Sequence, residues 1–196
     1  MASPPSRSSV PRKEASRDWR GVGAFGLIAQ RRGWDYEDLD ISEVAVQFAQ
    51  ALGLRARVIQ DRVPDIPESS VDLIVMWEVI EHIWNVSEYL TTIRVALRPN
   101  GMLLLSTPNY FRSCYQTTDE WGTSGPPVHL QFFTPESLKA TLSLAGFRTV
   151  HLHRRRVWRP SRLSFGEVIR SARMAAGLEA PPTLYAFATV PSLRER

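Results

Sequence analysis

Apolar runs of strand length alternate along this chain with segments that carry apolar residues at helical spacing. Two runs are almost entirely apolar, VDLIVMW at residues 71–77, where Asp72 is the one charged residue, and MLLL at the start of MLLLSTP at 102–108; this predicts strands that are buried on both faces. Shorter strand-like runs lie at residues 56–60, 147–154 and 183–190. Helical patterns separate them at residues 41–54, 86–97 and 134–146.

Capping residues mark the ends of two of these helices. Ser42 is a side chain of the type that begins a helix, and Gly53 is suited to end it. Thr134 is the predicted cap of the last helix, with Pro135 in its first turn and Gly146 after its end. The pattern therefore predicts helices with defined ends between the strands.

The order of these elements predicts an α/β fold, a doubly wound and mostly parallel sheet with helices on both faces. The strands at 147–154 and 183–190 are separated by a long segment, so they are expected to pair antiparallel at the sheet edge. Ligands in such folds bind outside the carboxyl ends of the strands. Residues that follow each strand are therefore the candidates for a functional site.

The chain of 196 residues is long enough for one domain and hardly for two. We expect residues 1–16, which are basic and rich in Ser and Pro, to form a disordered tail, and residues 17–196 to form a single domain. No apolar run approaches the length of a membrane helix, and no secretory signal is visible. The single cysteine, Cys114, excludes a disulfide framework and fits a reducing, cytoplasmic setting.

Positive charge is concentrated in one stretch. Residues 154–173 carry seven Arg and one Glu, and we treat this stretch as an Arg-rich insertion in the domain. It could make weak contact with phosphates or an anionic membrane surface. A solvated loop and helix face is the favoured interpretation, because the net charge of the chain is only +4. We therefore do not expect nucleic acid as a partner.

Candidate ligand contacts follow three early segments of the chain. The GVGAFG stretch at residues 21–26 would let backbone approach a ligand at a helix N-terminus, although an ordinary tight turn would look the same. Asp40, or in second place Asp38, lies where an acid contacts ribose hydroxyls, unless both acids are only solvated. Asp61 and the backbone N–H of Arg62 could bind an adenine ring, but a turn-capping Asp is an open alternative.

The stretch EVIEH after the 71–77 run holds two carboxylates and an imidazole. Glu78, Glu81 and His82 follow i, i+3, i+4 spacing, so they share one face if the stretch is helical. Two carboxylates and a neutral imidazole are acceptable ligands for a divalent ion. The alternative is a helix start whose acids favour the N-terminus and whose His packs or caps.

From about Gly21 to Gly146 the chain resembles the class I S-adenosylmethionine-dependent methyltransferases, in the small-molecule branch that includes the ubiquinone-type O-methyltransferases. The resemblance rests on GWDYEDLDISEVAVQFAQALGL, on the stretch from DRVPDIPESSVDLIVMWEVIEHIWN to RPNGMLLLSTPN, and on HLQFFTPESLKATLSLAGF. It implies a Rossmann-like sheet of seven strands with S-adenosylmethionine across the strand ends.

The resemblance also implies roles for individual residues. The cofactor-binding positions are Gly21 and Gly23 in the glycine loop, Asp40 on the ribose, Ile41 against the adenine, Asp61 and Arg62 near the adenine edge, and Trp77 and Glu78 beside the cofactor. Glu78, Glu81 and His82 match a metal-assisted substrate site that would take an ion such as Mg²⁺. His129 matches a position that lines the acceptor pocket. If the acceptor has to lose a proton, His82 or His129 could remove it.

The first motif departs from the family pattern. The family opens with an apolar strand that ends in an acid and a glycine, whereas this chain has SRDWRGVG, with Arg17 and Trp19 in those two positions and Asp18 next to them. The first strand is therefore expected to be degenerate or missing. The change falls on the side of the site that would hold the amino-acid end of the cofactor.

The function that the residues and the resemblance favour is methyl transfer to a small-molecule acceptor, with O-methylation first. One alternative is a catalytically inactive binding domain or a truncated gene product, which the altered first motif favours. A nicotinamide-dependent oxidoreductase is a weaker alternative, because the dinucleotide pattern requires a strand directly before its glycines.

Overall fold

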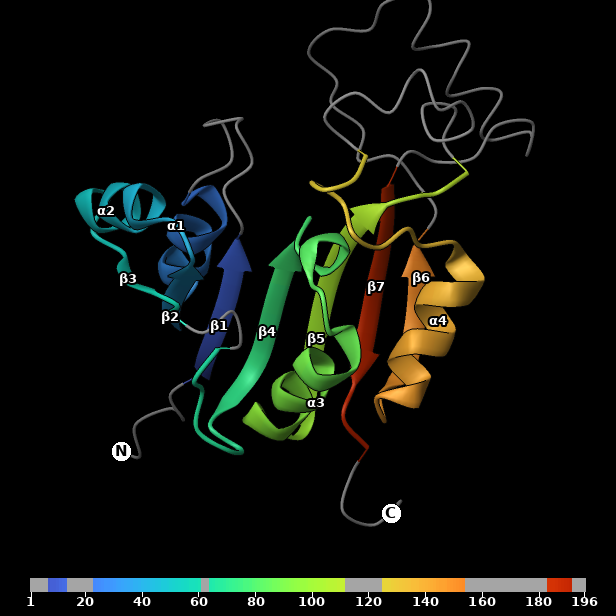
Figure 1. The fold of residues 1–196 in the computed structure, drawn as a ribbon. Helices are drawn as coiled ribbons and strands as arrows, with labels where there is room; N and C mark the ends of the chain where they lie inside the picture. The colour runs from blue at the N-terminus through green and yellow to red at the C-terminus, as the bar shows by residue number, and fades with distance from the viewer. Residues whose placement is uncertain (1–6, 14–22, 61–63, 112–124, 154–182, 192–196) are drawn as a thin grey trace, which may run out of the picture.

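The computed structural model describes residues 7–13, 23–60, 64–111, 125–153 and 183–191. These residues form a sheet of seven strands in the order β3-β2-β1-β4-β5-β7-β6 (Figure 1). The strands are β1 Arg7–Lys13, β2 Trp34–Asp40, β3 Arg55–Val58, β4 Val71–Trp77, β5 Leu97–Pro108, β6 Arg148–His153 and β7 Thr183–Thr189. The helices are α1 Ala24–Arg31, α2 Glu43–Ala51, α3 Val86–Ala96 and α4 Pro135–Leu144, with a 3-10 turn, η2, at Ile80–His82.

Strand direction confirms the doubly wound, mostly parallel sheet. The pairs β1–β2, β1–β4, β2–β3 and β4–β5 are parallel, and β7 is antiparallel to both β5 and β6. The antiparallel pairing of β6 with β7 follows the prediction, but of these two strands only β6 is an edge strand, while β7 lies inside the sheet. The carboxyl ends of β1, β2, β4 and β5 therefore meet along one edge of the sheet.

The first strand is present, in the middle of the sheet, and this differs from the sequence expectation. Residues 7–13, which fell within the expected disordered tail, pair with β2 from Arg7↔Trp34 to Arg12↔Leu39 and with β4 from Ser9↔Leu73 to Lys13↔Trp77. Strand pairing uses main-chain groups, which two flanking strands can satisfy for polar residues as well as apolar ones; Pro11 is the exception in β1, because its backbone has no N–H. A polar sequence such as RSSVPRK therefore gives no pattern by which the strand could be recognised.

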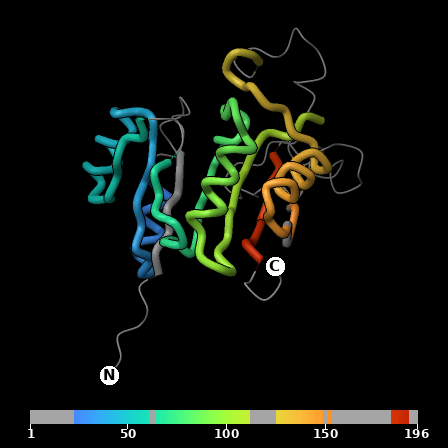
Figure 2. The backbone as a smooth tube through the Cα atoms, turned by 60° about the horizontal axis from the view of Figure 1, so that its bottom comes forward, coloured from blue at the N-terminus to red at the C-terminus, as the bar shows by residue number. Residues whose placement is uncertain are grey.

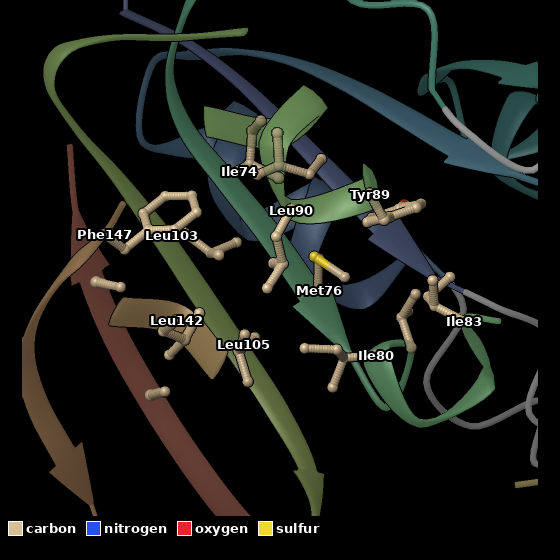
Figure 3. Packing of buried hydrophobic residues seen from close by; sticks show 14 of the residues in the cluster. Ile74, Met76, Ile80, Ile83, Tyr89, Leu90, Leu103, Leu105, Leu142 and Phe147 are labelled. Atoms are coloured by element: carbon tan, nitrogen blue, oxygen red, sulfur yellow. The ribbon is translucent and has the colours of Figure 1, made fainter. Parts of the chain in front are cut away.

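The main core lies between β4, β5 and β7 on one side and α3 and α4 on the other (Figure 1). Figure 3 shows Ile74 and Met76 of β4 beside Leu90 of α3, and Leu103 and Leu105 of β5 toward Leu142. Adjacent strand residues point to opposite faces, so Trp77 lies on the face away from α3. There it contacts Phe25 of α1, with ring centroids 5.8 Å apart.

A second, smaller cluster joins α1 and α2 to β2. Its buried members are Ala29, Tyr36, Ala49 and Leu54. Figure 2 shows these first elements as a group set to one side of the strands and helices that follow. Among the described residues no helix is long and apolar enough to cross a membrane, and the longest, α3, has 11 residues.

Candidate active site at the carboxyl ends of the strands

Asp40 is the last residue of β2 and its carboxylate is fixed. Its side chain is buried, and Oδ1 accepts a hydrogen bond of 2.8 Å from the Ser42 backbone N–H. Ser42 caps α2 as predicted, accepting from the Ala45 N–H, and the Asp40 carbonyl accepts from the Ile59 N–H at 2.9 Å. Ile41 is 46% exposed directly beside it. Asp40 therefore places an oriented carboxylate at the strand edge, next to an accessible apolar side chain.

Asp38, the second candidate for the ribose contact, has a different environment. It is buried and accepts a hydrogen bond from the hydroxyl of Tyr36, two residues away on β2. Burial first, and then the negative charge of Asp38, raises the pKa of Tyr36 far above its ordinary value. Tyr36 therefore stays protonated and donates to Asp38. This contact favours Asp40 as the residue that meets a ligand.

The glycine loop is described only from Gly23 onward. Gly23 caps α1 with φ of 77°, and a Cβ there would lie 2.7 Å from Leu52 Cδ1. A Cβ on Gly26 would lie 2.5 Å from Tyr36 Cε1, so glycine lets α1 approach β2 closely. At both positions the neighbouring side chains leave no room for a Cβ, so packing alone accounts for the glycine. Gly21, Asp61 and Arg62, which we predicted to bind the cofactor, lie outside the described residues.

Trp77 stands at the centre of a row of aromatic rings along the strand ends. Phe25 lies between Tyr36 and Trp77, at 6.3 Å and 5.8 Å, and Trp77 meets Tyr185 of β7 edge to face at 6.4 Å. Trp77 and Tyr185 are half-buried. The row gives this edge a rigid aromatic wall, built from both halves of the chain.

Glu78 follows Trp77 with a backbone conformation that only glycine adopts readily. Its φ is 51°, and its N–H lies 3.1 Å from the carbonyl and 3.2 Å from the hydroxyl oxygen of Ser106. The Ser106 hydroxyl donates to Glu78 Oε1 at 2.7 Å. The chain is therefore turned at Glu78, and the predicted helical face through Glu78, Glu81 and His82 does not form; the 3-10 turn begins only at Ile80.

Glu81 is buried and ties three elements together. Its carboxylate accepts a hydrogen bond of 2.9 Å from the Thr107 hydroxyl at the end of β5. Its carbonyl accepts from the backbone N–H groups of Leu130 and Gln131, at 2.8 and 3.0 Å. The loop that leads into α4 is thereby held against η2.

This loop brings His129 to His82. Nδ1 of His82 lies 2.6 Å from the carbonyl oxygen of Val128, which can only accept, so Nδ1 carries a proton and Nε2 presents its lone pair in the neutral ring. The two imidazole centroids are 4.8 Å apart, and Nε2 of His82 is 3.9 Å from Glu81 Oε1. His82 thus has a basic nitrogen in a fixed orientation.

The group with metal-ligand geometry differs from the predicted one. Among the described residues, Glu81, His82 and His129 each offer one ligand atom, and these three atoms lie within 4.8 Å of one another. In this group His129 takes the place that was predicted for Glu78. The Val128 carbonyl on the other ring nitrogen of His82 is the outer contact that metal-binding histidines usually have. A carboxylate and two imidazoles suit a transition-metal ion better than Mg²⁺, which prefers oxygen ligands.

Sequence reasoning missed three residues at this edge. Ser106 and Thr107 hold the two glutamates, and Tyr185 closes the aromatic row. The hydroxyls directly after the apolar MLLL run were a usable signal, because polar groups at a strand end face the ligand edge. Tyr185 gave no signal, since it alternates with apolar residues like any strand residue.

A family model described as a methyltransferase domain matches residues 21–152. The chain belongs to this methyltransferase family. The match begins after β1, at the glycine loop, so the polar first strand lies outside the part that resembles the family. The seven-stranded, mostly parallel sheet of this methyltransferase domain agrees with that assignment.

Two curated proteins are similar in sequence to this methyltransferase domain. A "Probable S-adenosylmethionine-dependent methyltransferase" of Mycolicibacterium smegmatis is 29% identical over 130 residues, which cover 65% of this chain and 47% of that protein. A ubiquinone biosynthesis O-methyltransferase of Rickettsia conorii is 28% identical over 74 residues, which cover 37% of this chain and 26% of the relative. The chain thus spans less than half the length of these relatives.

One similar solved structure is an S-adenosylmethionine-dependent methyltransferase from Mesorhizobium loti. It superimposes with a TM-score of 0.69 at 19% identity, and the match covers 94% of this chain and 91% of that one. At this identity the likeness supports the Rossmann-like methyltransferase fold.

Proposed function

We propose that this chain transfers a methyl group from S-adenosylmethionine to a small-molecule acceptor, with an acceptor hydroxyl as the favoured nucleophile. The observation that carries the proposal is Asp40, a buried and oriented carboxylate at the carboxyl end of β2 in a chain of the methyltransferase family. Asp40 would accept hydrogen bonds from the ribose hydroxyls, and Ile41 would cover the adenine. The O-methyltransferase relative supports the choice of oxygen as the acceptor atom.

The reaction requires alignment more than activation of the donor, because a sulfonium methyl group is already electrophilic. When bound, S-adenosylmethionine would supply its methyl group to an in-line attack by the acceptor oxygen, with the methyl–sulfur bond breaking and S-adenosylhomocysteine as the leaving thioether. Before or during attack the acceptor loses its proton, and Nε2 of His82 is the proposed base. The Val128 carbonyl supports this role, because it keeps the proton on Nδ1.

A divalent ion is a second way to activate the acceptor. Glu81, His82 and His129 would hold it, and a bound ion would lower the pKa of an acceptor hydroxyl. Metal analysis of the purified chain, followed by turnover with and without a chelator, separates the two mechanisms. Turnover that survives complete metal removal supports His82 as the base, whereas turnover restored only by added ion supports the metal.

The first test of the function is calorimetric titration with S-adenosylmethionine and S-adenosylhomocysteine. Asp40→Asn keeps an oxygen for the Ser42 N–H but removes the charge, so it is expected to weaken both ligands by about 10- to 100-fold. Asp38→Asn is the matched control, because Asp38 contacts Tyr36 and is expected to leave the affinities nearly unchanged. A folded wild-type chain that binds neither ligand would contradict the proposal and favour a non-catalytic binding domain.

A further inference from the structure

A buried hydroxyl lies at the end of β5, on the strand face that is otherwise packed into the apolar core. Leu103 and Leu105 of β5 belong to this core, and Figure 3 shows Leu105 in the same apolar cluster as Ile80 of η2. Alternate residues of a strand share a face, so Thr107 faces the same way as the two leucines. Thr107 is fully buried, and a valine would have the same shape without the polar group. Because a buried hydroxyl is costly unless it is hydrogen-bonded, Thr107 is expected to have a specific partner.

The partner is the carboxylate of Glu81, in the middle of η2. The Thr107 hydroxyl donates to Glu81 Oε2 at 2.9 Å, and both side chains are buried. This hydrogen bond connects the end of β5 with the turn that follows β4 along the chain. Inside a protein such a bond is stronger than at the surface, because the local dielectric constant is low. The side-chain pair is therefore suited to fix the position of η2 relative to the sheet.

The loop that carries His129 is attached both to η2 and to β5. Next to η2, the Glu81 carbonyl accepts hydrogen bonds from the backbone N–H groups of residues 130–131. Next to β5, a hydrogen bond of 2.8 Å runs from the Tyr110 N–H to the Phe133 carbonyl. The end of β5, η2 and this loop thus form a closed triangle of contacts, in which the side-chain bond described above links β5 to η2.

The tautomer of His82 depends on the geometry of this triangle. Nδ1 of His82, on η2, lies 2.6 Å from the Val128 carbonyl, on the loop, and this contact keeps the proton on Nδ1. A displacement of about 1 Å would exceed hydrogen-bonding distance and release the proton to either ring nitrogen. Because the loop is also attached to β5, it cannot follow a movement of η2 freely. The link between β5 and η2 therefore controls the contact that orients His82.

We propose that Thr107 is a positioning residue for the proposed base: its hydrogen bond to Glu81 fixes η2 against β5 and thereby keeps His82 in its tautomer and next to His129. The proposal rests on the proposed function, because it explains how the base of that same reaction is oriented. In this role Thr107 touches neither cofactor nor acceptor. Glu81 acts here through an acceptor oxygen and not through its charge, which distinguishes the role from metal binding.

The test is heteronuclear NMR of the imidazole nitrogens in the ligand-free chain, at about pH 8, where an ordinary imidazole is neutral. Wild-type His82, whose signals a His82→Gln variant assigns, is expected to show a protonated Nδ1 and an unprotonated Nε2. Thr107→Val removes the hydroxyl at nearly constant shape and is expected to give a mixture of both tautomers, whereas Thr107→Ser is expected to retain the wild-type signals. Thr189→Val is the matched control, because the Thr189 hydroxyl lies on β7, 3.5 Å from the Arg148 carbonyl.

Two variants of Glu81 separate the acceptor oxygen from the charge. Glu81→Gln keeps an oxygen for the Thr107 hydroxyl and is expected to retain the wild-type tautomer of His82. Glu81→Met has a similar length but no such oxygen, and it is expected to lose the tautomer. Loss in the glutamine variant as well would overturn the positioning role and show that the charge of Glu81 is required. These two variants carry the test if Thr107→Val does not fold.

The remaining outcomes are also specific. A Thr107→Val chain with a lower melting temperature but the wild-type tautomer would overturn the proposal and leave Thr107 with a role in stability alone. Calorimetry on the same samples is expected to show that Thr107→Val changes S-adenosylhomocysteine affinity by less than about twofold, and a loss of about tenfold would place its effect on the cofactor side instead. A wild-type chain that shows the expected tautomer but binds no S-adenosylhomocysteine would overturn the proposed function while supporting the link from Thr107 to His82.

Discussion

The two halves of the sheet are stabilised in different ways. The large half, β4, β5, β7 and β6 with α3 and α4, buries a continuous cluster that includes Leu103, Leu105 and Leu142. The small half, β1, β2 and β3 with α1 and α2, has among its described residues a separate cluster of four buried side chains, which includes Tyr36 and Leu54. Asp40 lies in the small half, whereas His82 and Glu78 follow strand β4 of the large half. The residues predicted to bind the cofactor are therefore shared between the two halves, whereas the larger apolar cluster belongs mainly to one of them.

The largest expected loss of stability comes from truncating a buried side chain in the large half. Leu105→Ala is expected to cost about 2–5 kcal/mol of unfolding free energy, because Leu105 is fully buried among other apolar side chains. The cost of Leu54→Ala in unfolding free energy is expected to lie at or below the lower end of that range, because the cluster around Leu54 in the small half can relax toward solvent. Urea unfolding of both variants measures the difference, and equal costs would remove the distinction between the halves.

A smaller loss of stability is expected from adding a methyl group to the packed contact between α1 and β2 in the small half. Gly26→Ala places a methyl group 2.5 Å from Tyr36 Cε1 and is expected to cost about 1–3 kcal/mol. It should also weaken cofactor binding, because α1 would be displaced from β2. Tyr36→Leu makes room, so the double variant is expected to be less destabilised than the sum of the single changes. Strict additivity in thermal unfolding would argue against this contact.

The smallest expected effect is a difference in stability between two variants of Glu78, which separates backbone strain from ligand binding at this position. Glu78→Gly and Glu78→Ala both remove the carboxylate and should weaken S-adenosylhomocysteine alike. The glycine variant is expected to be more stable by about 1 kcal/mol, because glycine adopts a φ of 51° without a Cβ clash. Chemical denaturation of the pair measures this difference. An alanine variant as stable as the glycine variant would show that the backbone relaxes at this position.

Much of the large half could be predicted because its pattern is strong. The apolar run at 71–77 matches β4, the run at 102–108 lies within β5, which begins earlier at Leu97, and Thr134 caps α4 as expected. The small half was harder: β1 is polar, and α2 carries apolar residues on several sides. In α2, Val46 and Ala49 are buried while Val44 and Phe48 are exposed, so the predicted apolar stripe did not define the packed face.

For the candidate site, the sequence predicted individual residues but not how they are grouped. Asp40, Glu81 and His82 could be predicted as site residues because they lie at or shortly after the carboxyl ends of strands. The separation of Glu78 from Glu81 could not be predicted, because it depends on a positive φ at a glutamate. The meeting of His82 and His129 could not be predicted either, because backbone bonds from Leu130 and Gln131 to Glu81 create it.

The position of β7 has a consequence for how the molecule is made. β7, Thr183–Thr189, is the last of the described strands in sequence but lies between β5 and β6. During synthesis, β5 and β6 leave the ribosome before the strand that joins them, so the sheet cannot close until β7 has emerged. Until then two strand edges need protection from pairing with other chains.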